Sequence, residues 1–443
     1  MIALIALSLS FFAAQPTLAQ PPEDNPRAAV LVQQAAGQIR NHDFSKAQDA
    51  LIEAKGLNPK QRGLWITYAA LFSSTNRADM AIASVQTEID NYPGQPELYR
   101  LLARTQLSNK RTDDAISTLR ELLKIAPLDP EGLHDLARLL LNVKRFDEAM
   151  DLAGQAVAAF PTNADFQVLR AEALLRAGYK EEGVAAARAM AGYSLTPPML
   201  NNVAVALTDT GADIPLAVDF ADRSVKSFED ELKNLNLSTL TPSQLTDISY
   251  LANSWDNDGW ARFRSGDIDG GLKYVEAAWR LGQFAVAGDH LGQILDRKGN
   301  RAEAIHVWQL TLATSSKQPD VAERLRKLAP PEPVRPSGHS IVVSPAEEVS
   351  KMRNVAIPGF SRPKGSAEFF VLLSANGVED VSFISGAEDL RAAKDQIAKA
   401  HFDVSFPDAG PEKITRRGIL SCSQYTTPNC QLVLLLPSNT KVP

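Results

Sequence analysis

Histidines and acidic residues are the side chains of this sequence with the widest chemical repertoire, and their spacing argues against catalysis. No two of the six histidines stand four residues apart, the spacing at which one helix offers two ligands to a metal ion. His290 follows Asp289, but such a histidine on a helix is more often a packing or capping residue. No glycine-rich phosphate loop or Gly-x-Ser-x-Gly motif occurs. We therefore expect no enzyme, no metal site and no cofactor. The histidines are His42, His134, His290, His306, His339 and His401.

The two cysteines, Cys422 and Cys430, flank a short segment near the C-terminus. In an exported protein such a pair most often forms a disulfide. Closing so short a loop would stabilise the fold by about 2 to 3 kcal/mol. A redox or metal-binding pair is the alternative, but the spacing differs from that of a two-cysteine redox loop and no histidine lies nearby. We expect a disulfide.

A regular repeat organises the first part of the chain. Proline recurs at positions 59, 93, 127 and 161, and alanine stands twelve and twenty-four positions before each of them. A period of this length predicts antiparallel helix pairs in a solenoid rather than one compact core. Alanine lets two helices approach closely, and proline ends the second helix of each pair. Large residues at Trp65, Tyr99 and Leu133 would fill the space between successive pairs.

This order of large, small, alanine and proline positions resembles the tetratricopeptide repeat. One copy is marked by Trp65, Ala69, Ala81 and Pro93. The next two are marked by Tyr99, Ala103, Ala115 and Pro127, and by Leu133, Ala137, Ala149 and Pro161. The sequence departs from the pattern at Glu88 and Leu122, which replace a usual alanine, and at the glycine-type position, which is alanine in every one of these copies. The resemblance implies a scaffold that binds protein segments.

The resemblance also implies where a partner would bind. The first helix of each pair lines the concave surface, and its exposed positions follow the large residue by one and five. In two successive repeats these positions are Arg100 and Arg104, then His134 and Arg138. Such a cationic stripe suits an acidic peptide segment or a chain end, because arginine forks pair with carboxylates. The alternative is that acidic neighbours such as Glu97, Glu131 and Glu172 neutralise the arginines, which then only solubilise the groove.

The chain divides into five parts by pattern. We expect a signal peptide at 1–19, five repeats at 27–195, and divergent repeats with a closing helix at 199–330, interrupted by an insert near 228–244. A proline-rich linker at 331–365 and a small α+β domain at 366–437 follow. The predicted fold class is an all-α solenoid of helix pairs followed by this small domain.

The C-terminal part predicts strands at 368–373 and 378–384, a helix at 386–400, and strands at 418–422 and 430–436. Its stretches "VEDVSFISG", "HFDVSFPDAG" and "RRGILSC" resemble the C-terminal domain of the TonB type, which in its relatives pairs with a peptide strand. The stretches "AEFFVLLSANG" and "GDHLGQIL" also resemble bacterial secreted repeat proteins whose longer members carry a transglutaminase-like domain. The chain has no room for that domain, so its activity does not carry over.

The net charge limits the class of partner, and the N-terminal segment indicates the location of the protein. The net charge of −6 argues against nucleic acid. Met1 to Ala19 is apolar and uncharged, which indicates a signal peptide cleaved after Ala19 and a periplasmic or secreted protein without a membrane span. A retained anchor is the alternative, although the segment is short for a span.

Two functions follow as hypotheses. The first is a non-enzymatic scaffold of the bacterial cell envelope that binds a protein or peptide in the concave groove. The second is an envelope coupling protein whose TonB-like domain binds a partner strand, with the repeats as a spacer.

Overall fold

The structure is a computed structural model. It describes residues 23–328, 343–358, 364–402, 404–407, 413–423 and 430–437. The predicted signal peptide at 1–19 lies outside these residues. The chain forms two compact units, Met1–Ala159 and Phe160–Pro443, and each is described by itself.

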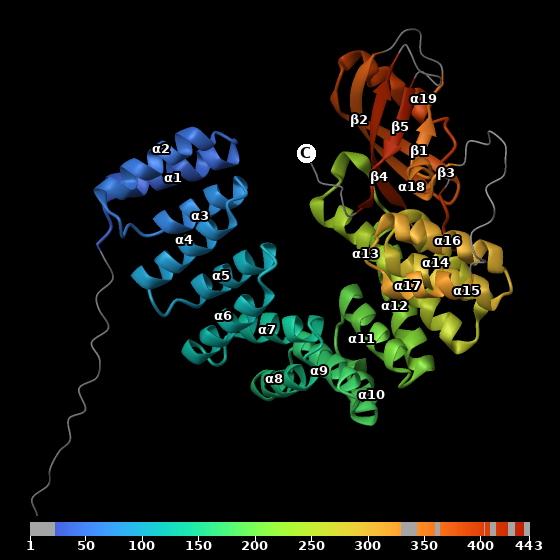
Figure 1. The fold of residues 1–443 in the computed structure, drawn as a ribbon, viewed down its shortest axis with the longest axis horizontal. Coiled ribbons are helices and arrows are strands. Elements are labelled where there is room, and N and C mark those ends of the chain that lie inside the picture. The colour runs from blue at the N-terminus through green and yellow to red at the C-terminus, as the bar shows by residue number, and fades with distance from the viewer. Residues whose placement is uncertain are drawn as a thin grey trace, which may run out of the picture. The chain divides into compact units, whose positions relative to one another are not determined.

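The first unit consists of four antiparallel helix pairs that follow one another along the chain (Figure 1). Its helices are α1 (Pro26–Arg40), α2 (Phe44–Leu57), α3 (Leu64–Ser74), α4 (Ala78–Asn91), α5 (Pro96–Ser108), α6 (Thr112–Ile125), α7 (Pro130–Asn142) and α8 (Phe146–Ala159). The second helix of each pair ends two residues before one of the four periodic prolines, as the pattern predicted.

The periodic alanines are the contact points within each helix pair. All eight of them are at most 5% exposed, which is what close helix crossing requires. They are Ala35, Ala47, Ala69, Ala81, Ala103, Ala115, Ala137 and Ala149. The period therefore marks the positions where bulk is excluded, and the predicted solenoid fold is confirmed.

The turn inside each pair also repeats. His42, Asn76, Lys110 and Lys144 stand at the same position of their repeats and all adopt a left-handed backbone, with φ between 57° and 62°. In the next pair this position is Gly178, with φ 96°. A left-handed residue lets the chain leave one helix and start the next within a few residues. The polar turns are thus fixed by backbone geometry rather than by one residue type.

The second unit continues the helix pairs and then adds a sheet. Its pairs are α9 (Ala164–Arg176) and α10 (Lys180–Ala189), α11 (Pro197–Thr210) and α12 (Ile214–Leu232), α13 (Pro242–Ser265) and α14 (Ile268–Gly282), and α15 (Ala285–Arg297) and α16 (Arg301–Thr314). The helix α17 (Pro319–Leu328) packs against α16. Two 3-10 helices, η1 (Met190–Gly192) and η2 (Leu237–Thr239), interrupt the series. The predicted insert corresponds to the segment around η2.

The C-terminal elements form one antiparallel sheet with the strand order β1-β5-β4-β2-β3. The strands are β1 (Asn354–Ala356), β2 (Gly365–Ser374), β3 (Gly377–Gly386), β4 (Ile414–Cys422) and β5 (Cys430–Leu434). The predicted helix at 386–400 is present as a 3-10 helix η3 (Glu388–Ala393) followed by α19 (Lys394–Ile397). The small α+β region therefore exists, with one more strand than the sequence indicated.

Part of the segment that we predicted to be a linker belongs to the folded structure. The helix α18 (Pro345–Lys351) contacts α16, and β1 pairs with β5. A strand of three residues is too short to show the alternation of apolar and polar residues that identifies strands. The prolines were therefore the clearest feature of the sequence at 331–365. The sheet thus begins before residue 366.

The sheet and the last repeat helices share one hydrophobic core. A continuous cluster of buried residues runs from Val225 on α12 to Leu434 on β5. Within it, the ring of Trp255 on α13 meets the ring of Phe406 edge to face, with centroids 6.0 Å apart. The small C-terminal region is therefore packed on the repeats. Among the described helices, none combines the length and the apolar character needed to cross a bilayer.

Candidate functional site

The four predicted groove residues lie on the first helices of two successive pairs. Arg100 and Arg104 are on α5, and His134 and Arg138 are on α7. Both helices begin with a proline, and the carboxylate of Asp129 caps α7 by accepting a hydrogen bond from the amide of Gly132 at 2.7 Å. The repeat geometry thus fixes the starting point of each helix and with it the phase of these side chains.

Arg100 is bound by acidic neighbours. Its Nη1 donates to both carboxylate oxygens of Asp129 at 2.7 Å. Its Nε lies 3.1 Å from a carboxylate oxygen of Glu131, and its Nη2 lies 3.5 Å from Glu97. The side chain is only 13% exposed. Arg100 therefore joins α5 to the start of α7, and its charge is already neutralised.

Arg104 is more exposed than Arg100 and lies farther from carboxylates. Its side chain is 64% exposed, and its nearest carboxylates, Glu131 and Asp135, lie 3.8 and 3.9 Å from Nη2. His134 is half-exposed, with Nδ1 3.4 Å from Asp135. Arg138 lies one helical turn beyond His134 and is partly buried. The surface formed by α5 and α7 consequently alternates in charge.

For Arg100 these contacts favour the alternative hypothesis, in which acidic neighbours neutralise the arginines. Arg100 pairs with Glu97 and Glu131, two of the residues that this hypothesis named. It also pairs with Asp129, a partner that was not anticipated because an N-cap residue belongs to the turn before the helix. Glu172 on α9 forms an ion pair with Arg176 of its own helix, at 3.3 Å. Arg104 is the member of the predicted stripe with the most accessible guanidinium.

A second polar cluster lies on the first helices α13 and α15. His290 Nδ1 is 3.0 Å from Oδ1 of Asp256, not of its sequence neighbour Asp289, and its ring stacks on Trp260 with centroids 4.1 Å apart. Burial by itself would lower the pKa of His290, but the hydrogen bond to Asp256 and the negative charges of Asp256, Asp289 and Asp209 together raise the pKa. Asp289 instead accepts hydrogen bonds from Trp308 Nε1 and Arg324 Nε, each at 3.1 Å.

Among the described residues, His290 forms no hydrogen bond with a serine, threonine or cysteine. Within the same residues, no group of three or more metal-binding side chains comes together. Asp256 orients the imidazole of His290, which stacks on Trp260 of α13.

The two cysteines meet at the end of the sheet. Cys422 on β4 and Cys430 on β5 are paired in register, and their sulfur atoms are 2.03 Å apart. This disulfide links the neighbouring strands β4 and β5, and it lies far in sequence from the repeat surfaces.

Comparison with known proteins identifies the repeats. Two tetratricopeptide-repeat family models match the chain, one over residues 69–130 and the other over residues 106–173. Residues 69–173 are tetratricopeptide repeats. The helix pairs on either side of this stretch continue the same alternation of first and second helices. No curated protein matches the chain.

Several solved structures are similar to this chain at low sequence identity. A tetratricopeptide repeat protein from Parabacteroides merdae is 11% identical over 68% of this chain and 98% of its own, with a TM-score of 0.42. PilF from Pseudomonas aeruginosa is 14% identical over 45% of this chain and 91% of its own, with a TM-score of 0.34. YrrB, described as having an unusual peptide-binding site, is 15% identical over 40% and 92%, with a TM-score of 0.32.

Proposed function

We propose that this protein is a non-enzymatic scaffold that captures a peptide segment of a partner protein on the first helices of its tetratricopeptide repeats. The observation that carries the proposal is Arg104, which presents an exposed guanidinium with no carboxylate of the described residues closer than 3.8 Å. A carboxylate of a partner peptide would complete its bidentate hydrogen bonding. Arg100 serves to fix α5 against α7, so the partner's acidic group is expected at Arg104.

The test is capture of the natural partner from cell extract by the full chain. Replacing Arg104 and Arg138 by alanine should abolish capture and leave the helical circular dichroism unchanged. The matched control replaces Arg27 and Arg111, two exposed arginines on other surfaces, and removes the same charge. Capture that survives the first pair of substitutions, or that is lost equally in both variants, would sink the proposal.

We further propose that the scaffold acts outside the cytoplasm, in the bacterial cell envelope. The apolar, uncharged composition of residues 1–19 and the pairing of Cys422 with Cys430 support this, because disulfides persist in oxidising compartments. Mass spectrometry of the protein from its native cells should find Gln20 at the N-terminus in the periplasm or medium. Recovery of the uncleaved chain from the cytosol would contradict the proposal.

A second function is supported by one specific feature of the sheet. The ten-residue strand β3 ends the strand order, so its outer edge has no strand partner among the described residues. A partner could add a strand there, as the resemblance to the TonB type implies. Hydrogen exchange of the full chain with its co-purified partner separates the two functions. Protection at 377–386 supports strand addition, and protection at 96–108 and 130–142 supports the groove.

A further inference from the structure

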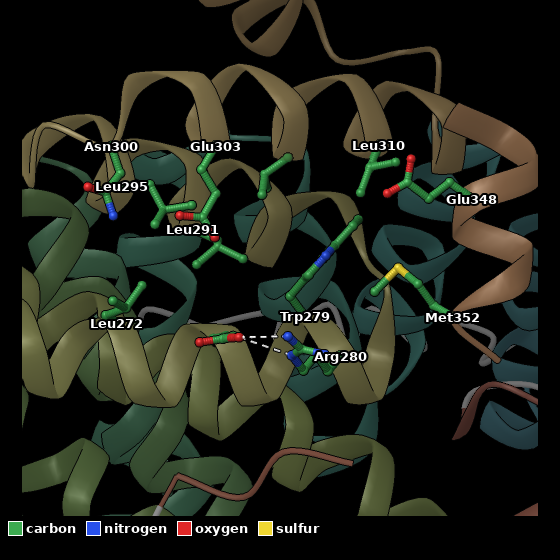
Figure 2. A pocket seen from close by; sticks show the side chains of 12 residues that line it. Leu272, Trp279, Arg280, Leu291, Leu295, Asn300, Glu303, Leu310, Glu348 and Met352 are labelled. Atoms are coloured by element: carbon green, nitrogen blue, oxygen red, sulfur yellow. Dashed lines mark hydrogen bonds and ion pairs between the residues drawn. The ribbon is translucent and has the colours of Figure 1, made fainter. Parts of the chain in front are cut away.

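A cavity of about 310 Å³ lies between the second helices of two successive pairs, α14 and α16, with α15 beneath them (Figure 2). The helix α18 closes one end of it and contributes Glu348 and Met352. This surface is distinct from the first-helix surface to which the proposed peptide binding belongs. We call it the α14–α16 groove.

The inner wall of the α14–α16 groove is apolar. Leu291 and Leu295 of α15 and Trp279 of α14 lie deepest and are each at most 4% exposed. The remaining apolar lining residues are Leu272, Val307, Leu310 and Met352. Small-ligand pockets occupy roughly 300–1,000 Å³, so this cavity is at the small end of that range. Its size and open form suit a few side chains of a protein segment better than a cofactor.

The rim of the groove is acidic. Glu276, Glu303 and Glu348 surround the apolar wall, and among the described residues the only basic one that lines it is Arg280. Arg280 binds Glu276 through Nε and Nη2, both at 3.0 Å, so that pair is neutral. Glu348 lies 2.8 Å from His306 Nε2, and Glu303 is exposed and forms no ion pair with any residue the structure describes. A net negative charge therefore remains at Glu303 and Glu348.

This rim is not a constant property of the repeat. The corresponding groove between α6 and α8 has a cavity of about 360 Å³, and Leu136, Leu140 and Glu148 stand where Leu291, Leu295 and Glu303 stand. Its rim carries Arg120 and Lys124 beside Glu148 and Asp151, and Arg120 forms an ion pair with Glu148. The earlier groove is thus balanced in charge. All of its described lining residues come from α6, α7 and α8.

We infer that the α14–α16 groove binds a basic amphipathic segment of a partner protein. Aliphatic side chains of the segment enter the cavity against Leu291, Leu295 and Trp279, and lysine or arginine side chains meet Glu303 and Glu348. The negative charge of the rim favours a basic segment over an acidic one, because Glu303 and Glu348 would repel the carboxylates of an acidic segment. The partly exposed side chains of Leu272 and Met352 supply further contact area at the mouth of the cavity.

The inference is tested with the full chain and a fluorescein-labelled peptide of leucine and lysine placed at helical spacing, using fluorescence anisotropy. Replacing Glu303 and Glu348 by glutamine should weaken binding by about tenfold, the effect of losing two rim contacts of opposite charge. Leu272→Trp should fill the cavity and abolish binding. A matching leucine and glutamate peptide should not bind.

The matched control is the double variant Glu148→Gln and Asp151→Asn, which removes two carboxylates from the earlier groove. It should bind the leucine and lysine peptide as the unaltered chain does. Equal weakening in both double variants would show attraction by overall charge alone and overturn the inference. Binding that is unaffected by Leu272→Trp, in a chain whose thermal unfolding is unchanged, would overturn it as well.

Discussion

Glu88 stands where the tetratricopeptide repeat usually has alanine, and its carboxylate explains the departure. Oε1 accepts a hydrogen bond from the amide of Gly63 at 2.7 Å and Oε2 accepts one from Trp65 at 3.2 Å. The side chain is 1% exposed and lies on α4, so it caps the start of its partner helix α3. One buried carboxylate thereby satisfies two amides that α3 leaves unpaired.

Restoring alanine at this position should therefore destabilise the protein. Glu88→Ala leaves two partly buried amides without acceptors, and we expect the free energy of unfolding to fall by about 1 to 3 kcal/mol. Glu88→Gln keeps one oxygen acceptor and should cost less. Urea denaturation of both variants measures the difference, and equal stability of Glu88→Ala and the unaltered chain would contradict the capping role.

The same carboxylate gives the protein a dependence on pH. Burial raises the pKa of Glu88 above its usual 4.5, against the lowering effect of its two backbone hydrogen bonds. The folded state thus holds this proton to a higher pH than the unfolded chain does. The contribution of Glu88 to stability therefore falls as the pH rises from 4.5 through the raised pKa, and Glu88→Gln should remove this slope.

At the scale of elements, the helix pairs tolerate departures when a neighbouring element compensates. Leu122 on α6 also replaces a usual alanine and is completely buried. It fits because the facing residue on α7 is Gly132, where an added Cβ would overlap the Cδ2 atom of Leu122. The space that Gly132 leaves on α7 is thus filled by the side chain of Leu122 on α6.

This pairing predicts a coupled effect of two substitutions. Gly132→Ala should destabilise the chain by about 1 to 3 kcal/mol through overpacking. In the background of Leu122→Ala, the same substitution should cost much less, because the overlapping methyl is gone. Gly154→Ala on α8, with no atom within 4 Å of the added Cβ, is the neutral control. Additive effects in urea denaturation would disprove the coupling.

The elements that repeat could be predicted from the sequence, and several of those that do not repeat could not. Periodic alanines and prolines located the first eight helices because each position has the same packing task in every pair. By contrast β1, three residues long, has no period to detect, and Asp129 was missed as the partner of Arg100 because it lies in a turn. The α14–α16 groove was not foreseen, since its lining comes from three repeat helices and from α18.

At the scale of the whole molecule, the sheet and the repeat helices α13 to α16 form one core within the unit Phe160–Pro443. The main chain carbonyl of Val349 on α18 accepts a hydrogen bond from Gln283 at 3.4 Å. Trp255 and Phe406 add an aromatic contact between α13 and the C-terminal region. The repeats are therefore more than a spacer that carries an independent sheet domain.

A shared core predicts shared unfolding. Phe369→Ala, at a fully buried position of β2, should cost about 3 to 5 kcal/mol and increase hydrogen exchange in α13 to α16 as well as in the sheet. Leu51→Ala, at a fully buried position of the other unit, is the matched control and should leave exchange in α13 to α16 unchanged. Exchange confined to the sheet in Phe369→Ala would show that the two parts unfold independently.

The helix that closes the α14–α16 groove is followed within two residues by the edge strand β1. Any occupant that contacts Glu348 and Met352 therefore binds a segment whose continuation is hydrogen-bonded to β5. By mass action, a ligand specific for the docked α18 raises the population in which β1 is paired. Binding of a ligand in the α14–α16 groove would then slow the opening of the edge strand β1 from β5.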